Sequence, residues 1–340
     1  MTLTKPRVAV VGATGAVGQQ MLQVLDERDF PLDSLILVAS PRSAGKTLSF
    51  RGEDHVVKAI APEVFDGVDI ALFSAGGGTS KEWAPVAAER GAIVIDNSSA
   101  WRRDENVPLV VPEVNAAAAK VRPKGIIANP NCSTIQMVVA LKPLHDAAQV
   151  TRVVVATYQA ISGAGAQASK AFEAQLGQFT RGETCDPSTF KGQLAGNLLM
   201  HWTPDVESGY QEEELKMVFE TRKILGDETI RVSPTAVRVP VLHSHSEALT
   251  VETEKGLDAA TARTLLENAP GVKVVDDFGA GIYPQAIDAT GSDWTYVGRI
   301  RDDIGNPGGV QLWVVSDNLR KGAATNAVQI AELLLQESAH

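Results

Sequence analysis

A glycine-rich turn near the N-terminus limits the fold more than any other feature of this sequence. A short apolar run at residues 7–11 ends at Gly12, and residues 15–28 then show a helical pattern with apolar side chains on one face. The turn between them reads GATGAVG at 12–18. A strand, a glycine turn and a helix in this order predict the first βα unit of a doubly wound sheet that binds a dinucleotide.

The spacing of the three glycines is GxxGxxG rather than GxGxxG, so a tight turn that binds no ligand remains the alternative. The next apolar run ends in ASPRS at 39–43. A site that prefers NAD usually carries an acid at this point, which holds the ribose hydroxyls. A cation and two hydroxyl side chains there favour a 2′-phosphate and therefore NADP, unless the segment is a solvated loop that happens to carry Arg42.

The length of 340 residues allows two domains or one large α/β barrel. Apolar runs at 35–39, 69–74 and 92–96, with a helical stretch at 81–90, predict parallel βαβ units over the first ~130 residues. After Cys132 a helix is expected at 133–148, and β patterns follow at 152–160, 229–232, 237–241, 248–253, 294–301 and 310–316. We therefore expect an α/β protein with a doubly wound, Rossmann-like domain at 1–131 and a second α+β domain at 132–319. The second domain would have a mixed or largely antiparallel sheet, and residues 320–340, which carry a helical pattern, would return to the first domain.

Charge and cysteine content narrow the function further. The 31 Lys and Arg against 41 Asp and Glu give a net charge of −10, which argues against nucleic acid or an anionic membrane as the main partner. The two cysteines form no CxxC pair, so we expect neither a disulfide framework nor a zinc site, and no metal site is predicted. The N-terminus reaches glycine too early for a signal peptide, and no apolar run approaches a membrane span, so the expected location is the cytoplasm.

Cys132 is the best candidate nucleophile. It stands in NPNCST at 129–134, after a proline turn and at the start of a helical pattern. The positive end of a helix dipole lowers the pKa of a thiol and supplies thiolate at neutral pH. The alternative is that Cys132 is a small buried apolar residue. Cys185, in a polar loop, is interpreted as incidental.

Nine motifs in register give the sequence a family resemblance over nearly its whole length. They are GATGAVG at 12–18, SPRSAGK at 40–46, DNSSAWR at 96–102, NPNCST at 129–134, YQAISGAG at 158–165, EELKM at 213–217, ETRKIL at 220–225, RVPVLHSH at 238–245 and SDNLRKGAA at 316–324. In these residues the chain resembles the bacterial aspartate-semialdehyde dehydrogenases. The resemblance implies an NADP-dependent oxidoreductase on the route from aspartate to lysine, threonine, methionine, isoleucine and diaminopimelate, working as a cytoplasmic homodimer.

The resemblance also implies a role for individual residues. Cys132 would attack C4 of the substrate to form an acyl-thioester, and His245 would be the general acid and base. Gln159 would orient the substrate, Arg238 would hold its α-carboxylate and Glu213 its α-amino group, while Arg102 and Lys216 would bind phosphate. The implied cofactor site consists of Thr14, Gly15, Ala16, Val17, Arg42, Ser43, Ser162, Gly163 and Asn318.

These residue types suit the chemistry, but each has a simpler alternative. Hydride transfer to or from a thiohemiacetal needs a thiolate, a base that works near neutral pH and a donor to the oxyanion. Glu213 and Lys216 could instead belong to an exposed ladder of ion pairs along a helix. Arg102, beside Arg103, could be loop surface, and His243 competes with His245 for the catalytic role.

The strand period makes one awkward prediction. Arg238 and His245 are seven residues apart, so on a regular strand their side chains would face opposite sides of the sheet. Because the resemblance assigns both to one pocket, we predict a bulge or bend between Val239 and Ser244, where Pro240 cannot donate to a ladder.

The sequence thus predicts an enzyme that reversibly converts L-aspartyl-4-phosphate to L-aspartate 4-semialdehyde with NADPH. An N-acetyl-γ-glutamyl-phosphate reductase uses the same kind of chemistry on a longer, acylated substrate and is one alternative. A non-catalytic relative of the fold is the other alternative.

Residues 182–192 contain Pro187 and polar neighbours, and we expect them to form a mobile loop.

Overall fold

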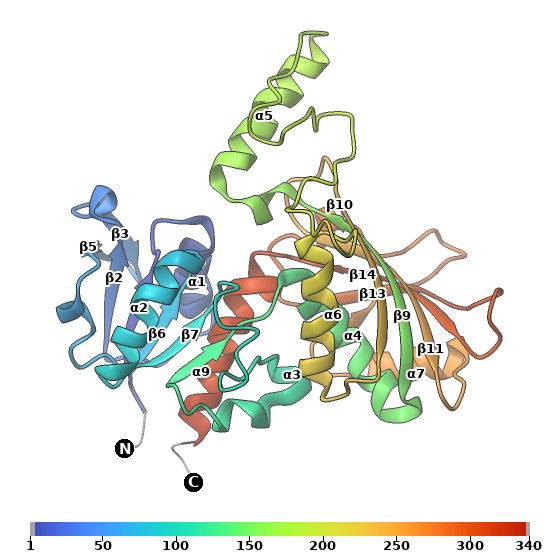
Figure 1. Cartoon of the computed structure of the whole chain (residues 1–340), viewed down its shortest axis with the longest axis horizontal. Helices are drawn as coiled ribbons and strands as arrows, with labels where there is room; N and C mark the ends of the chain where they lie inside the picture. Colours follow the sequence, from blue (N-terminus) through green and yellow to red (C-terminus); the bar gives the residue numbers. More distant parts are fainter. Residues whose placement is uncertain (1–3, 338–340) are drawn as a thin grey trace. The chain divides into compact units, whose positions relative to one another are not determined.

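The computed structural model describes residues 4–337 (Figure 1), and the chain divides into two compact units. The first unit comprises Met1–Asn131 with Ala323–His340, and the second comprises Cys132–Gly322. Each unit has its own six-stranded sheet.

The sheet of the first unit is parallel throughout, in the order β5-β2-β1-β6-β7-β8. Its strands are β1 (Arg7–Val11), β2 (Ser34–Ala39), β5 (Lys58–Ala59), β6 (Ile70–Phe73), β7 (Ile93–Asp96) and β8 (Ile126–Ala128). The strand order reverses beside β1, as in the doubly wound dinucleotide-binding fold, and the predicted fold of this part is confirmed. The sequence did not predict the small antiparallel hairpin of β3 (Thr47–Phe50) and β4 (Glu53–Val56), or β5 and β8.

Helices cover the first sheet and complete its core. They are α1 (Ala16–Glu27), α2 (Gly77–Glu89), the one-turn α3 (Pro112–Asn115) and α9 (Thr325–Glu337). Buried side chains of α9, including Val328, Ile330 and Leu334, pack into the same apolar core as β1 and α1. Arg28 and Glu332 add an ion pair of 2.7 Å between the segments of α1 and α9. The last helix is therefore part of the first unit, where its apolar face is buried.

The sheet of the second unit is mixed, as predicted, in the order β10-β9-β11-β14-β13-β12. Its strands are β9 (Val150–Gln159), β10 (Arg231–Arg238), β11 (His245–Thr253), β12 (Val272–Val274), β13 (Thr295–Asp302) and β14 (Val310–Ser316). The pairs β9–β10 and β12–β13 are parallel, and the other pairs are antiparallel. The helices α4 (Cys132–Ala148), α6 (Glu212–Leu225) and α7 (Ala259–Glu267) pack on strands of this sheet, and α8 (Ala286–Ala289) is a single short turn.

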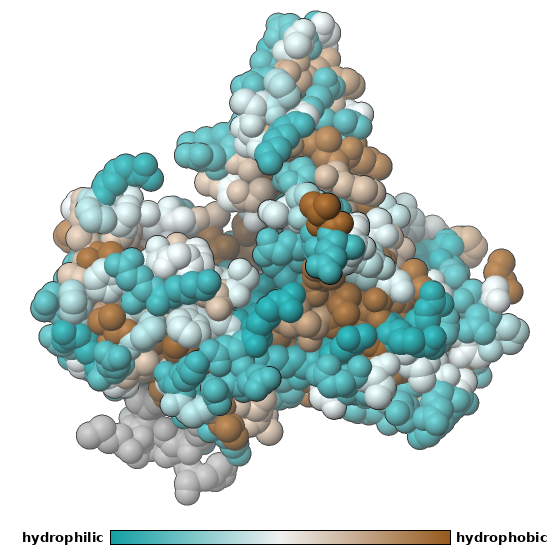
Figure 2. Space-filling model, viewed as in Figure 1, coloured by the Kyte–Doolittle hydropathy of each residue, from teal (hydrophilic) through white to brown (hydrophobic). Residues whose placement is uncertain are grey.

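The helix α5 (Ala166–Thr180) projects from the rest of the second unit (Figure 1). Its inner face and the loop after it form a small separate core around Phe172, Phe190 and Leu194, which also buries Cys185. Phe179 on α5 and Met200 in the following segment are exposed apolar side chains. The surface of the projecting part of the second unit shows hydrophobic patches among hydrophilic ones (Figure 2). The residues 182–192 lie in this loop without helix or strand.

Candidate active site

The side chains of Cys132 and His245 meet in the second unit. Cys132 is the first residue of α4, so its sulfur lies at the positive end of that helix. His245 is the first residue of β11 and is 1% exposed. The distance from Cys132 Sγ to His245 Nε2 is 3.1 Å, which is hydrogen-bond contact for sulfur. A thiol and an imidazole at this distance form a nucleophile and an acid–base partner.

A backbone group fixes the protonation pattern of His245. The N–H of Ala160 donates to His245 Nδ1 over 2.9 Å, so the neutral ring carries its proton on Nε2, facing Cys132. Burial, together with the nearby charge of Arg238, lowers the pKa of His245 well below its ordinary value. The imidazole is therefore neutral near pH 7 and presents an N–H to the sulfur.

The chain between Arg238 and His245 leaves the sheet. Strand β10 ends at Arg238, residues 239–244 bend without strand structure, and Ser244 has a φ of +70°. Strands β10 and β11 then lie on opposite sides of β9. The predicted bend is confirmed. The predicted strand at 237–241 is wrong beyond Arg238, because Pro240 cannot donate and the segment crosses over the end of β9.

Two substrate-binding candidates lie at the ends of neighbouring strands. Arg238 ends β10 and Gln159 ends β9, and the two residues are paired in the parallel register. They are 3% and 1% exposed. Burial lowers the pKa of the Arg238 guanidinium, and the charges of Glu213 and Cys132 oppose that effect. An arginine keeps its charge under such a shift, so the site holds a buried cation beside the nucleophile.

Glu213 on α6 faces inward toward the same residues. It is 6% exposed, and its Oε1 accepts a hydrogen bond of 3.1 Å from Gln159 Nε2. Lys216 Nζ lies 3.3 Å from Glu213 Oε2 and 3.4 Å from Glu212 Oε1. Lys216 therefore forms the predicted ion pairs with Glu212 and Glu213 along α6. Of these two glutamates, Glu213 is the buried one, and it contacts the site through Gln159.

Ser162, Gly163 and Asn318 form one cluster next to His245. Asn318 Nδ2 donates to Ser162 Oγ over 2.9 Å, and Asn318 Oδ1 accepts the N–H of Ser244 over 2.9 Å. A Cβ on Gly163 would lie 3.5 Å from the His245 ring and 3.6 Å from both Arg238 and Asn318. These three predicted cofactor residues thus border the Cys132–His245 pair.

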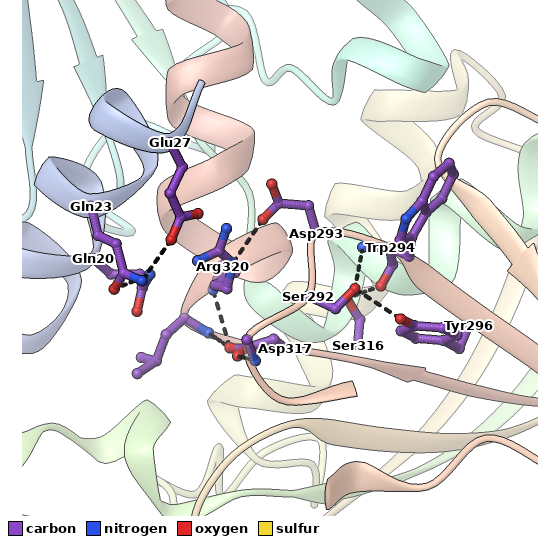
Figure 3. Close-up of polar contacts among 12 residues, drawn as sticks. Gln20, Gln23, Glu27, Ser292, Asp293, Trp294, Tyr296, Ser316, Asp317 and Arg320 are labelled. Carbon is purple, nitrogen blue, oxygen red and sulfur yellow. Dashed lines mark hydrogen bonds and ion pairs between the residues drawn. The ribbon is translucent and has the colours of Figure 1, made fainter. Parts of the chain in front are cut away.

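The turn that carries Asn318 is held by charge and hydrogen bonds (Figure 3). Asp317 Oδ1 accepts the N–H groups of Leu319 at 2.8 Å and Arg320 at 3.2 Å. Arg320 Nε in turn donates to Asp293 Oδ1 over 2.8 Å. These contacts fix the turn after β14 that carries Asn318.

The other predicted cofactor residues lie in the first unit. Thr14, Gly15, Ala16 and Val17 form the turn into α1, whose N-cap has no side-chain hydrogen bond and whose first turn has no acid. A Cβ on Gly18 would lie 2.2 Å from the carbonyl oxygen of Gly12, so only glycine permits this close packing. Arg42 and Ser43 stand in a short 3₁₀ turn directly after β2. In the glycine turn the N–H of Gly15 already donates to the Gly12 carbonyl over 2.9 Å, so the first N–H groups of α1 are the ones that can face an anion.

Arg102 also belongs to the first unit and is not loop surface. It is 6% exposed, and its guanidinium donates to the carbonyls of Asn129 and Asn97 over 3.0 Å each. The first of these carbonyls precedes Cys132 by three positions in the chain.

Three contacts at the site were not predicted from the sequence. Ser133 Oγ accepts a hydrogen bond from Gln159 Nε2, and Ala160 orients His245 through its backbone. Gly322 lies against Cys132, where a Cβ would come within 2.9 Å of the cysteine Cβ. Ser133 lies in the motif NPNCST and Gly322 in the motif SDNLRKGAA, so these motifs give a sequence signal for the first and third contacts.

Among residues 4–337, no group of three or more His, Cys, Asp or Glu side chains is placed to hold a metal ion. No helix in this range is both long and apolar enough to cross a membrane.

Comparison with known proteins gives the same family for both units. Residues 7–121 match the semialdehyde dehydrogenase NAD binding domain, and residues 141–321 match the semialdehyde dehydrogenase dimerisation domain. An aspartate-semialdehyde dehydrogenase of Aquifex aeolicus is 57% identical over 334 residues, which is 97% of this chain and 98% of that protein.

Solved structures agree with the sequence comparison. The crystal structure of aspartate semialdehyde dehydrogenase II of Vibrio cholerae, complexed with ASA, matches with a TM-score of 0.95 at 49% identity, covering 98% of this chain and 99% of that one. The Candida albicans enzyme with NADP matches with a TM-score of 0.76 at 25% identity, covering 97% and 98%. The resemblance seen in the motifs is confirmed, and the chain belongs to the aspartate-semialdehyde dehydrogenase family.

Proposed function

We propose that this chain catalyses the reversible, NADPH-dependent reductive dephosphorylation of L-aspartyl-4-phosphate to L-aspartate 4-semialdehyde. The observation that carries the proposal is the 3.1 Å contact between Cys132 Sγ and His245 Nε2, beside buried groups of both charges. A substrate with a carboxylate, an ammonium group and a phosphate needs this combination of nucleophile, cations and one acid.

Cys132 is the nucleophile. Its thiolate attacks C4 of the acyl phosphate, so that a sulfur–carbon bond forms and the carbon–oxygen bond to phosphate breaks. The N-terminus of α4, the Nε2–H of His245 and the charge of Arg238 all stabilise the negative sulfur. Bound NADPH supplies the hydride that reduces the resulting thioester.

His245 serves as the acid and base of the cycle. The departing phosphate has to gain a proton, and the alkoxide of the thiohemiacetal needs a donor until it collapses to the aldehyde and the Cys132 thiolate. The neutral imidazole donates a hydrogen bond from Nε2 to each of these oxygens, and the alkoxide then collapses without a net proton. A proton taken from solvent forms the imidazolium, which gives a proton to phosphate and returns to the neutral tautomer that the Ala160 N–H favours.

Substrate recognition uses the charges around this pair. Arg238 binds the α-carboxylate and Glu213 the α-ammonium group, while Gln159 orients the carbon skeleton through an amide already held by Glu213. Arg102 and Lys216 bind the phosphate. These assignments follow the family motifs, and the placement of Arg238 and Glu213, both buried beside Gln159, supports them.

The residues of the first unit suit NADPH as the cofactor. After the glycine turn at Thr14–Val17, the first N–H groups of α1 can face a pyrophosphate, and the start of this helix carries no acid that would repel it. Arg42 and Ser43 follow β2, where they would select the 2′-phosphate of NADP. Ser162, Gly163 and Asn318 would hold the nicotinamide end.

The protein works as a homodimer through its second unit. Residues 141–321 match the family's dimerisation domain, and Tyr158 on β9 is 37% exposed, with its ring centre 5.4 Å from that of Trp313. A nucleophilic thiol and a nicotinamide cofactor both suit the reducing cytoplasm, which we propose as its location.

A phosphate-dependent dehydrogenase assay tests the proposed function. Purified protein under reducing conditions should reduce NADP when given L-aspartate 4-semialdehyde and inorganic phosphate, and should do so less well with NAD. Omission of phosphate should remove the activity, since hydrolysis is not the proposed reaction. A wild-type protein that reduces no NADP under these conditions would contradict the proposal and favour a non-catalytic relative.

Replacement of Glu213 by alanine should lower kcat/KM for aspartate semialdehyde by about 10²-fold, because the substrate ammonium group would lose a buried charged partner. Glu212→Ala is the matched control, since Glu212 pairs with the same Lys216 from an exposed position. Steady-state kinetics of both variants give the comparison. Unchanged kinetics in Glu213→Ala would favour an acylated substrate, as in the N-acetyl-γ-glutamyl-phosphate reductases.

A further inference from the structure

The guanidinium of Arg238 makes contacts with the protein that none of the roles above requires. Its Nη1 donates to the carbonyl of Ala160, and its Nε donates to His201 Nε2 over 3.2 Å. The Trp202 ring lies against the same group, with its centre 4.7 Å from Arg238 Cζ. Because Nε is already engaged, a carboxylate can pair with Arg238 in two-point fashion only through the Nη1–Nη2 edge.

Backbone hydrogen bonds hold His201 and Trp202 in register with Arg238. Leu199 and Arg238 exchange two of them, of 3.1 Å and 2.8 Å. On the far side, the N–H of Trp202 donates to Gln211 Oε1 over 3.3 Å, at the N-cap of α6. The segment with the histidine and the tryptophan is thus fixed between β10 and α6.

The contact with Arg238 requires a neutral His201. An arginine N–H can only donate, so His201 Nε2 must be the acceptor and the proton must lie on Nδ1. The rings of Phe190 and Trp202 pack against His201, with centres 6.1 Å and 4.9 Å away. Three charged groups also act on the imidazole. Burial, together with the charges of Arg238 and Lys191, lowers the pKa of His201 below its ordinary value, while Glu213 opposes them.

We propose that His201, with Trp202 packed on the guanidinium, is a positioning residue that holds Arg238 for the substrate carboxylate and makes this recognition sensitive to pH. The inference rests on the proposed function, in which Arg238 binds the α-carboxylate. Neither histidine nor tryptophan touches a reacting atom in this arrangement.

The direction of the pH effect follows from the hydrogen bond. A protonated His201 has no lone pair for Arg238 Nε and places a second cation beside the guanidinium. Arg238 then loses its anchor on one side. The KM for aspartate semialdehyde should therefore rise as the pH falls through the pKa of His201, with kcat changing much less.

Two variants separate the parts of this proposal. His201→Gln keeps an acceptor for Arg238 but cannot be protonated, so its KM should stay near the wild-type value at about pH 8 and lose the acid rise toward about pH 5.5. His201→Leu removes the acceptor, and its KM should be about tenfold higher or more at every pH. His55→Gln, a histidine in the first unit, is the control.

A substrate without the carboxylate isolates the role of Arg238. The kcat/KM for 3-aminopropanal should be the same in wild type and both His201 variants, because Arg238 has nothing to bind on that molecule. A KM in His201→Gln that still rises in acid, or a His201→Leu variant that changes kcat while KM stays constant, would overturn the positioning role.

In a Cys132→Ala background the reaction cannot occur, so calorimetry measures the Kd of aspartate semialdehyde alone in the presence and absence of the His201 substitutions. There the His201 variants should shift Kd as they shift KM. Binding that depends on His201 in a wild-type protein with no dehydrogenase activity would leave the positioning role standing and reject the proposed reaction. An active enzyme whose Kd is indifferent to His201 at all pH values would reject the positioning role alone.

Discussion

Replacement of Cys132 by alanine is expected to lower kcat by at least about 10⁴-fold, because no other group can form the thioester. The loss should appear in kcat rather than in KM, since alanine leaves Arg238, Glu213 and Gln159 in place for binding. The phosphate-dependent reduction of NADP by the purified variant measures it directly. The smaller alanine side chain fits the space near Gly322 without new contacts, so the variant should unfold at nearly the wild-type temperature.

Cys185→Ala is the matched control for this experiment. Cys185 is also a free cysteine, 5% exposed in the small core under α5, where its sulfur contacts the carbonyl oxygen of Gln175. We expect full activity with a modest loss of stability from the removed apolar sulfur. Comparable loss of activity in both variants would show that thiol chemistry at Cys132 is not the cause.

Replacement of His245 by asparagine should lower kcat by about 10²–10⁴-fold, which is the usual contribution of a general acid or base. Asparagine retains a hydrogen-bond donor near Cys132 but cannot exchange a proton near neutral pH. Because burial and Arg238 lower the pKa of His245, the wild-type kcat should stay level down through pH 6.5 and fall only in more acidic solution. The variant should lack this acid limb in its kcat profile.

His243→Asn provides the comparison for that result. His243 lies two positions away in the same bend and is partly exposed. The sequence alone leaves both histidines as candidates, whereas the 3.1 Å contact to Cys132 belongs to His245. A large kcat loss in His243→Asn with normal kinetics in His245→Asn would reverse the assignment.

The fold of the first unit could be predicted from the sequence because each parallel strand is a continuous apolar run bounded by turns. Strands such as β1 and β6 are buried on both faces, so their composition alone identifies them. The β3–β4 hairpin was missed because both strands are four residues long and mostly exposed. Helix α5 was missed because it is rich in Ala and Gln, and few of its side chains enter a core.

The chemistry of the site was predictable only where side chains carry it. Cys132 stood out because a thiol follows a proline turn at the start of a helix. The N–H of Ala160 has no sequence signal, since every residue except proline has one. His201 lies 37 positions from Arg238, and the backbone pairing of Leu199 with Arg238 brings them together. Long-range pairing of this kind cannot be read from local patterns.

The parallel pairing of β9 with β10 has a consequence for changes in chain length. Arg231–Arg238 is matched one to one with Arg152–Gln159, so one residue inserted within β10 would turn the side chains beyond it to the other face of the sheet. Arg238 would then point away from Gln159, although every residue type was still present. The loop at 182–192 has no such register to lose and can change length more freely. Specificity in this protein is therefore encoded as much by the count of residues in two strands as by their identity.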